Sequence, residues 1–461
     1  MLQQPNRPWF RNAPATAAAA PVVGGAYAWY VVAVLVVAYT FSFLDRQILS
    51  LLVEPMKRDL SLSDTQISLL QGLAFASFNA LAGLPLGRLV DTTRRTTVIA
   101  AGVAFWSLMT VGCGLVKSYA LLLLMRMGVG AGEATLTPAA HSMIGDYFPP
   151  HKVGLPLAVY SMGIFVGGGL ALVIGATVIA QVAVESIILP LVGTIYGWQL
   201  VFLIVGAPGL LVALWAMTLR EPARTGPVHA SGKTPIPEVW AYLKDNWVTF
   251  ASLNLGFAVL AMMSYGLAAW IPTFFIREHG WSAVEIGHAY GLIYLVFGPL
   301  GVLCGGLLGD FTAARGVRNA RLVVTLGVVI ATAPFLTFFP LVADAKLALA
   351  LLAGAVFFKT FINGLAPALL LQMVPNQMRG LGASASLLII NLVGLGLGPT
   401  SIALFTDLVL GDEQKLGVSL VVVPLAASVV GFLLLTTAYK PYLRTLGRLA
   451  AWNARAERAG G

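Results

Sequence analysis

Charge is what this sequence has least of. Asp, Glu, Lys and Arg make up only 10% of its 461 residues, whereas a soluble protein carries about 25%. Hydrophobic residues make up 58%, more than a water-soluble fold of this length can place away from water. The net charge of +9 would suggest nucleic acid as a partner in a soluble protein, but the basic residues lie almost entirely in short connections between apolar runs. The composition therefore predicts a membrane protein and argues against a nucleic-acid-binding protein.

Cysteine and enzymatic motifs are also scarce. The two cysteines, Cys113 and Cys304, lie in separate hydrophobic segments and offer neither a disulfide framework nor metal-ligand spacing. No Walker phosphate loop is present, which argues against ATP-driven pumping. Neither a hydrolytic triad nor a metal-binding spacing supports a membrane enzyme. The sequence thus predicts a protein that is not an enzyme and has no cofactor.

Long apolar runs are what the sequence has in abundance. Each run of about twenty residues, at 1.5 Å per residue in a helix, is long enough to cross a hydrocarbon layer of about 30 Å. The runs are continuous, whereas strands of a membrane barrel would alternate in polarity over about ten residues. We therefore predict an all-α membrane protein with twelve transmembrane helices. The expected spans are 28–53, 65–90, 96–116, 119–142, 153–182, 197–219, 248–276, 284–309, 320–340, 346–372, 380–408 and 416–438.

The polar segments divide the chain into two six-helix halves, 26–219 and 248–440. Between the halves, residues 220–247 form the longest polar stretch and contain four prolines, so they are expected to be a cytoplasmic linker. The last part of this linker, with Trp240 and Trp247, suits a short helix lying in the membrane interface, and a plain connector is the alternative. Residues 1–25 lack the apolar core of a signal peptide and are predicted to be a disordered cytoplasmic tail. Residues 441–461 are expected to form a second cytoplasmic tail.

The distribution of basic residues predicts the orientation. Most Lys and Arg residues lie in the connections on the side of the amino terminus. By the positive-inside rule, both termini are expected in the cytoplasm of a multi-pass protein of the inner (plasma) membrane. The opposite side carries only Lys57, Arg58, Lys117, Arg277, Lys346 and Lys415.

The two halves repeat one motif. Gly87-Arg-Leu-Val-Asp91 closes the second span and is followed by Arg94 and Arg95, and Gly306-Leu-Leu-Gly-Asp310 closes the eighth span before another basic turn. Duplication of a six-helix unit is how many transporters create a central site that opens alternately to either side.

At these residues the chain resembles the major facilitator superfamily, over residues 28–440. The family's signature Gly-x-Leu-x-Asp-Arg-x-Gly-Arg-Arg is present here with Thr92 in place of its Arg and Arg94 in place of its Gly. The resemblance implies that this loop locks neighbouring helices in one of two access states. Asp91 is expected to cap the third span, and the two arginines to bind carbonyl groups or anionic headgroups. A loop whose charges only set the topology is the alternative. The gating residues implied are Gly87, Asp91, Arg94, Arg95 and Asp310.

Three further segments resemble the Spinster branch of that superfamily. They are Phe43-Leu-Asp45-Arg46-Gln-Ile-Leu49, Ser63-Asp-Thr-Gln66 and Arg126-Met-Gly-Val-Gly-Ala-Gly-Glu133. Members of that branch export sphingosine phosphate or move lysophospholipids. The resemblance therefore implies an amphipathic lipid substrate and, for a bacterial member, coupling to protons.

Five charged residues lie well inside the predicted spans: Asp45, Arg46, Arg126, Glu133 and Lys359. Each would cost about 2.5–3.5 kcal/mol at a helix centre, so each needs a charged partner or a water-filled cavity. Asp45 and Arg126 are expected at a similar depth, with Glu133 two turns deeper than Arg126 on the same face. We therefore expect Arg126 to lie beside Asp45 or Glu133. A static cluster that only fastens two helices is the alternative.

These residues lead to a functional hypothesis. The carboxyls Asp45 and Glu133 are expected to carry protons, because burial and a mobile arginine can switch their charge. Substrate contacts are expected from Arg46, Arg126, Lys359, Asn363 and Tyr265. Cavity cations outnumber cavity carboxylates, so the expected cargo is an amphipathic anion, carried by a monomer embedded in membrane lipids. The alternatives are a drug/proton antiporter, whose usual proline among the glycines of helix 5 is missing here, and an uncoupled lipid scramblase or receptor.

Overall fold

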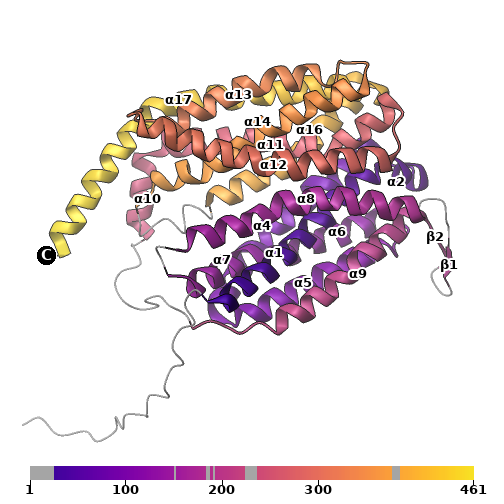
Figure 1. Cartoon of the computed structure of the whole chain (residues 1–461), viewed down its shortest axis with the longest axis horizontal. Helices are drawn as coiled ribbons and strands as arrows, with labels where there is room; N and C mark the ends of the chain where they lie inside the picture. The colour runs from indigo at the N-terminus through magenta and orange to yellow at the C-terminus, as the bar shows by residue number, and fades with distance from the viewer. Residues whose placement is uncertain are drawn as a thin grey trace, which may run out of the picture.

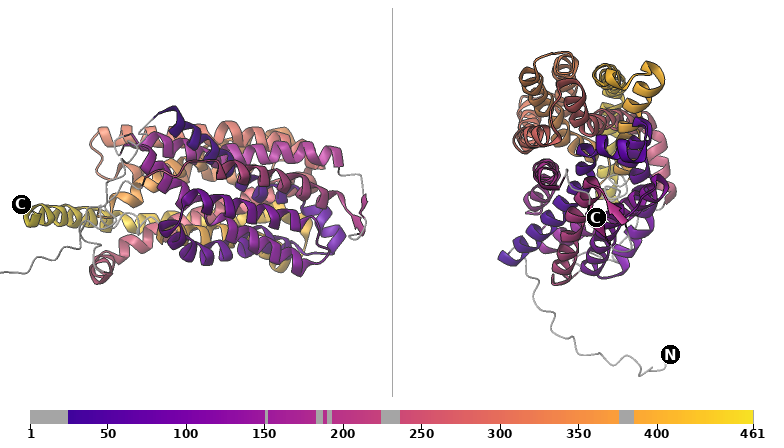
Figure 2. Two further views of the ribbon diagram at one scale, coloured as in Figure 1. Left: turned by 90° about the horizontal axis from the view of Figure 1, so that it is seen from below. Right: turned by 90° about the vertical axis from the view of Figure 1, so that its right-hand side faces the viewer.

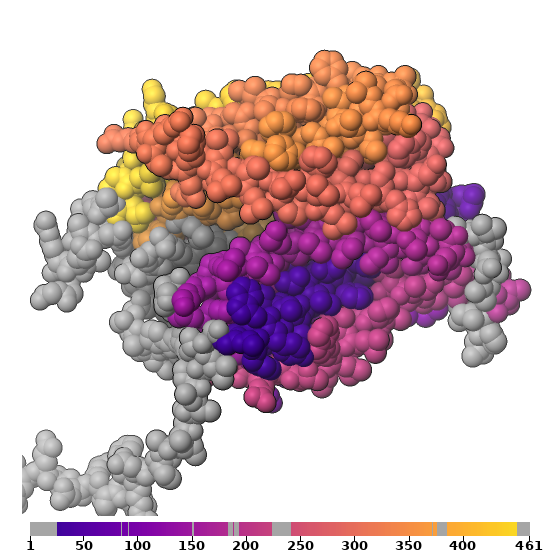
Figure 3. All heavy atoms as spheres, viewed as in Figure 1, coloured from indigo at the N-terminus to yellow at the C-terminus, as the bar shows by residue number. Residues whose placement is uncertain are grey.

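The computed structural model describes residues 25–149, 152–182, 187–189, 193–223, 236–375 and 385–460. Its long helices run side by side along one axis and form two blocks, the first half below and the second half above in Figure 1. Figure 3 shows the same two blocks as packed surfaces. The predicted all-α membrane architecture is confirmed.

The first half consists of long helices that match the predicted spans. They are α1 (Ala26–Gln47) with η1 (Ile48–Leu51), α3 (Asp64–Ser68) with η2 (Leu69–Leu73) and α4 (Ala74–Thr92), α5 (Arg95–Cys113), α6 (Tyr119–Glu133) with α7 (Leu136–Tyr147), α8 (Gly154–Val182) and α9 (Gly197–Met217). A short helix, α2 (Val53–Leu60), follows the first span, and a hairpin of β1 (Ile187–Leu189) and β2 (Gly193–Ile195) precedes α9. Neither α2 nor the hairpin was anticipated.

The second half repeats this plan. Its helices are α11 (Trp247–His279), α12 (Ala283–Ala314), α13 (Ala320–Phe338), α14 (Ala345–Gln372), η4 (Ile390–Leu395) with α16 (Gly396–Leu404) and η5 (Phe405–Leu410), and α17 (Leu416–Gly460), which follows the short η6 (Glu413–Lys415). Among the described residues, 11 helices are long and apolar enough to cross a membrane. The predicted span 65–90 is the additional one, a continuous helical segment made of α3, η2 and α4.

Two boundaries differ from the predicted spans. The fourth span is interrupted between Glu133 and Leu136, because Pro138 has no N–H to donate to the Ala134 carbonyl one turn earlier. At the other end of the chain, α17 continues through 441–460, the segment expected to be a tail. In the linker, α10 (Ile236–Asp245) forms the short helix that was expected there. Residues 224–235 of the linker lie outside the described part of the chain.

The two halves meet along two helix crossings rich in glycine. In the first crossing, between α8 and α12, a Cβ on Gly169 would lie 2.8 Å from the Gly291 carbonyl oxygen, and the reverse distance is also 2.8 Å. In the second crossing, a Cβ on Gly72 in η2 would lie 2.6 Å from the carbonyl oxygen of Leu395 in η4. Only glycine permits backbones to approach this closely.

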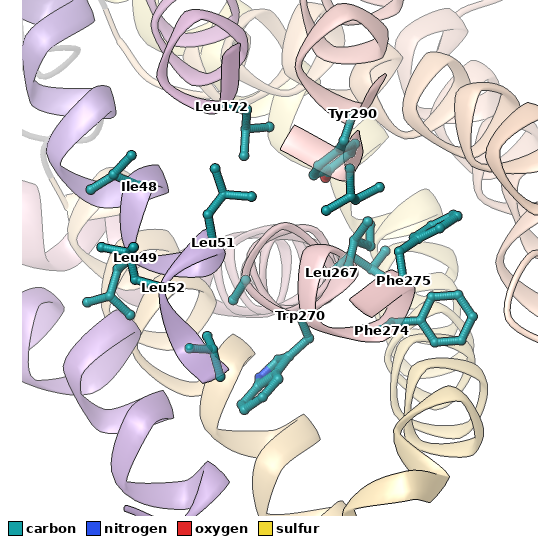
Figure 4. Close-up of a cluster of buried hydrophobic side chains, with 14 of the residues drawn as sticks. Ile48, Leu49, Leu51, Leu52, Leu172, Leu267, Trp270, Phe274, Phe275 and Tyr290 are labelled. Atoms are coloured by element: carbon teal, nitrogen blue, oxygen red, sulfur yellow. The ribbon is translucent and has the colours of Figure 1, made fainter. Parts of the chain in front are cut away.

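The apolar core is shared by the halves at one end of the bundle only. One cluster joins Ile48, Leu52 and Leu172 of the first half to Trp270 and Phe274 of the second half, and Figure 4 shows these side chains converging from both halves. The other core clusters belong almost entirely to one half each. We call the end with the shared core the closed end.

The opposite end of the bundle is the terminal end, where α1 begins, α10 lies and α17 leaves the bundle. The hairpin and α2 lie at the closed end (Figures 1 and 2). This arrangement places the start of α1, the end of α17 and the linker helix on one side of the molecule.

Candidate transport site

The centre of the site is an ion pair between α1 and α6. The Arg46 guanidinium donates from Nε to Glu133 Oε2 at 2.8 Å, and its Nη2 contacts the same oxygen. The Ser42 hydroxyl, one turn before Arg46, donates to that oxygen as well. The Glu133 side chain is completely buried, whereas 21% of the Arg46 side chain is exposed. Arg46 is therefore the member of this pair that a solute can reach.

Asp45 and Arg126 form a second layer beside this pair. Asp45 is 2% exposed and accepts a hydrogen bond from the Thr110 hydroxyl of α5 at 3.0 Å. Arg126, which is fully buried, donates to two backbone carbonyls, those of Asp45 at 3.1 Å and Leu70 at 3.3 Å. In the described part of the chain Arg126 forms no ion pair. It was expected beside Asp45 or Glu133, and it lies beside Asp45 through the backbone carbonyl, while the cation paired with Glu133 is Arg46.

Aromatic rings surround the Arg46 guanidinium. Its central carbon lies 4.9 Å from the ring centre of Phe43 and 4.4 Å from that of Phe75. Tyr39 stacks on Tyr160 with the ring centres 4.6 Å apart. A cation between aromatic faces is attracted by their electron density. These rings supply apolar walls next to a charge, a combination that suits an amphipathic ligand.

The second half contributes the other predicted contacts. Tyr265 of α11 is half-buried and interacts electrostatically with Arg46 across the boundary between the halves. Lys359 of α14 is 3% exposed, and its Nζ lies 5.5 Å from the Tyr294 ring centre. No hydrogen-bond partner for this ammonium occurs among the described residues. Asn363, one turn further along α14, is exposed. Arg46, Glu133, Tyr265 and Lys359 thus come from the first, fourth, seventh and tenth spans.

An ionic network that the sequence did not predict joins the halves at the closed end. Arg277 of α11 donates to both oxygens of Asp64, at 2.7 and 2.8 Å, and to Glu54 at 2.7 Å. Lys57 binds Asp64 at 2.5 Å and also contacts Glu413. The Asp64 side chain is fully buried and that of Arg277 is 5% exposed. We call these five residues the closed-end network.

A second network lies at the terminal end, within the first half. Buried Arg95 donates from Nε to Glu221 at 2.7 Å, to the Pro222 carbonyl at 3.0 Å and, from Nη1, to Asp146. It thereby ties the start of α5 to the end of α7 and to the segment after α9. The expectation that this arginine binds a carbonyl is confirmed, although carboxylates of the protein provide its charge partners.

The other residues of the repeated loop are less constrained. Arg94 is exposed and occupies the N-cap position of α5 that was expected for Asp91. The backbone of Asp91 lies within α4, and its side chain is outside the described part. A Cβ on Gly87 would meet open space. In the second half, Asp310 accepts a hydrogen bond from Arg321 at 2.8 Å.

We predict that Arg95→Ala destabilises the protein by about 3–5 kcal/mol, because it leaves two carboxylates without their cation. Partial burial alone would raise the pKa of Glu221, but hydrogen bonds from Arg95 and the Thr96 N–H lower the pKa below its ordinary value of 4.5. This contribution to stability is present above pH 4.5 and is lost as the pH falls through the lowered pKa. Thermal unfolding in detergent measures the effect. Arg94→Ala, an exposed neighbour, should change stability by no more than about 0.5 kcal/mol, and equal melting of the two variants would contradict the prediction.

The sequence model of the Major Facilitator Superfamily matches residues 35–399. The chain belongs to the major facilitator superfamily. It is a multi-pass membrane protein with the fold of transporters, as the duplicated loop motif indicated.

Within this superfamily, the chain is similar to an efflux pump and to Spinster proteins. An MFS-type efflux pump of Mycolicibacterium smegmatis is 32% identical over 91% of this chain and 94% of its own length. Protein spinster homolog 1 of Mus musculus is 28% identical over 66% of this chain and 59% of its own length. The crystal structure of a bacterial homologue of the human lysosomal transporter Spinster, inward-facing and occupied, superposes with a TM-score of 0.72 at 29% identity, covering 91% of this chain and 97% of that one. The predicted resemblance to the Spinster branch is confirmed.

Proposed function

We propose that this transporter is proton-coupled and moves an amphipathic anion by alternating access. The observation that carries the proposal is the pairing of partly exposed Arg46 with fully buried Glu133. An anion that enters between the halves reaches Arg46 before it reaches Glu133, because only Arg46 is partly exposed. The Arg46 guanidinium would bind both the substrate anion and Glu133. Substrate binding therefore weakens the ion pair between Arg46 and Glu133.

An ionised Glu133 without its cation is energetically unfavourable inside the membrane. Binding of a proton to Glu133 removes this negative charge. Substrate binding at Arg46 and proton binding at Glu133 therefore favour each other. Asp45 lies in the next layer, held by Thr110, and is a second proton carrier in this scheme. Arg126 fixes the backbone of Asp45 and lies where it can take over either carboxylate when the helices move.

The direction of access follows from the charge distribution. Since basic residues gather at the terminal end, we place this end and both termini in the cytoplasm. The bundle is then closed toward the outside and corresponds to an inward-facing state, which is also the state of the similar bacterial Spinster homologue in its crystal structure. The repeated loops with Gly87, Asp91, Arg94, Arg95 and Asp310 lie on the cytoplasmic side in this orientation, where they would gate the inner opening. Both halves contribute to the site, so one monomer is sufficient for transport.

We infer the substrate class from the side chains that surround Arg46 and Lys359. The aromatic rings beside Arg46 suit an apolar tail, and Lys359 provides a second cation in the opposite half. Together with the likeness to Spinster proteins, these features favour a lysophospholipid or a sphingoid phosphate, contacted by Arg46, Arg126, Lys359, Asn363 and Tyr265. The similarity to an efflux pump favours a second candidate, a drug/proton antiporter that uses the same carboxyls.

Transport in proteoliposomes with an imposed pH gradient tests the proposal. We expect lysophospholipid or sphingoid phosphate to accumulate with the gradient, while a hydrophilic sugar acid and a cationic dye do not. Lys359→Gln should reduce uptake of the lipid about tenfold by removing one charge-assisted contact. Accumulation of the dye alone would favour the antiporter, and transport that ignores the gradient would show an uncoupled protein.

A further inference from the structure

A polar pocket lies at the terminal end of the second half, away from the transport site. Its volume is about 310 Å³, and it lies among the turn after α12, the first turn of α13, the end of α14 and the part of α17 that contains Tyr442. We call it the α13 pocket. Its charged lining residues are Arg318 and Arg321, and none of its described lining residues is acidic.

Hydrogen-bond donors dominate this pocket. Helix α13 starts at Ala320, and its N-cap residue Asn319 makes no side-chain cap. The Asn319 Nδ2 group donates to the Tyr439 carbonyl. The first turn of a helix presents N–H groups and a partial positive charge. Arg318 and Arg321 add two guanidinium groups on the same side. The pocket is therefore lined by donors from the backbone and from the side chains, and Arg318 supplies a positive charge beside Arg321, which also binds Asp310.

One buried atom in the pocket wall has no partner. Asn319 is 3% exposed, and its Oδ1 has no hydrogen-bond donor among the described residues. A buried amide oxygen without a donor is destabilising, so this atom favours any ligand that can donate to it. A ligand that carries a hydroxyl or ammonium group next to its anionic group would satisfy this atom as well as the arginines.

The first half contains a comparable helix start at which an anion is bound. At the corresponding helix start, that of α5, the Glu221 carboxylate accepts hydrogen bonds from the Thr96 N–H at 3.1 Å and from Arg95 Nε at 2.7 Å. There the protein's own chain supplies the anion. In the second half, the equivalent end of the bundle continues as helix α17, whose described residues contribute no carboxylate to the pocket lining. Arg321 pairs instead with Asp310 of α12, whose side chain is 70% exposed and does not line the pocket.

We propose that the α13 pocket binds a phosphate ester whose alcohol part carries a hydroxyl or ammonium donor. The phosphate takes the place that Glu221 occupies in the first half, bound by Arg318, Arg321 and the first turn of α13. Arginine suits phosphate because its planar fork can donate two parallel hydrogen bonds. The donor group binds Asn319 Oδ1. A phospholipid headgroup such as phosphatidylglycerol and the soluble glycerol phosphate share this chemistry.

Binding measurements on the full chain in detergent test the proposal. The probes are short-chain phosphatidylglycerol, glycerol phosphate and, as a comparison, a phosphatidylcholine of the same chain length, whose ammonium has no hydrogen to donate. We expect one or both of the first two to bind at least tenfold more tightly than phosphatidylcholine. Binding of phosphatidylglycerol alone identifies a lipid site, and binding of both shows that the headgroup is sufficient.

Two variants and one matched control locate the site. Arg318→Gln removes an exposed arginine and should weaken binding about tenfold. Gln372→Glu keeps the hydrogen bond from the Tyr442 hydroxyl but adds a negative charge to the pocket, and should weaken binding at least as much. Arg315→Gln is the control, since Arg315 stacks on Phe311 with 4.1 Å to the ring centre and does not line the pocket. Equal binding by all three variants and the original protein, or no binding above the phosphatidylcholine level, would overturn the proposal.

Discussion

Replacement of Glu133 by Gln is expected to abolish transport driven by a pH gradient while folding is retained. Glutamine keeps the size and the hydrogen-bonding capacity of the side chain, so it can still accept from Ser42 and Arg46, but it cannot exchange a proton. Arg46 then no longer has to be shared with a carboxylate. Substrate binding at equilibrium should therefore be preserved or become tighter, even though accumulation falls to the level of empty liposomes.

The measurement combines uptake with and without a gradient, substrate binding, and thermal unfolding. Asp45→Asn is the companion variant, and it should have the larger effect if Asp45 is the proton carrier. Asp344→Asn removes one negative charge outside the site and keeps an oxygen for the hydrogen bond to the Leu347 N–H, so it serves as the control. Normal gradient-driven transport in both Glu133→Gln and Asp45→Asn would show that these residues form only a structural cluster.

Arg277→Ala is expected to open the closed end in a large fraction of the molecules. Arg277 is the cation that joins Asp64 and Glu54 of the first half to the second half. Breaking a buried pair of this kind costs about 3–5 kcal/mol, and about 5.5 kcal/mol separates a 99:1 population from a 1:99 population. Loss of this arginine can thus turn one strongly favoured state into a mixture of two states.

Spin labels on either side of the closed end would report this change. With Cys113 and Cys304 replaced by Ser, labels at Arg58→Cys and Gln414→Cys lie at exposed positions in different halves. We expect a second, longer distance population in Arg277→Ala. Lys415→Ala is the matched control, because its exposed contact with Asp412 lies within one half and is worth about 0–1 kcal/mol. An unchanged distance distribution in Arg277→Ala would show that the apolar core alone holds this end closed.

The bounds of the helix spans could be predicted closely because the thickness of the bilayer sets the length of each apolar helix. The first predicted span, 28–53, corresponds to Ala26–Leu51, and the fifth, 153–182, corresponds to Gly154–Val182. Hydropathy could not predict the continuation of α17 to Gly460, since a polar helix outside the bilayer carries no apolar signal. The break after Glu133 has a local cause in Pro138, but a proline in a membrane helix is often accommodated without a break.

The sequence could predict which residues form the candidate site, but not which of them contact each other. Charged residues are easily recognised within apolar spans, and the five that the sequence suggested all lie on helices of the bundle. These residues are Asp45, Arg46, Arg126, Glu133 and Lys359. The depths of the residues along their spans predicted Arg126 beside Asp45 or Glu133. In the structure Arg126 donates to the backbone carbonyls of Asp45 and Leu70, and the partner of Glu133 is Arg46. Helical rise predicts the level of a residue, and the pairing depends on how each helix is rotated about its axis.

By itself, the sequence determined that this chain lies in a membrane, that its helices form two repeated halves, and which charged residues lie inside the spans. These properties follow from the cost of placing polar groups in hydrocarbon, which every residue meets independently of its neighbours. Only the tertiary structure decided which end is closed. Arg277 and Asp64 are 213 residues apart in the chain, and each lies near a span end, where a charge is indistinguishable from one that sets the topology. Their contact exists because the two halves cross at glycines and bring these span ends together.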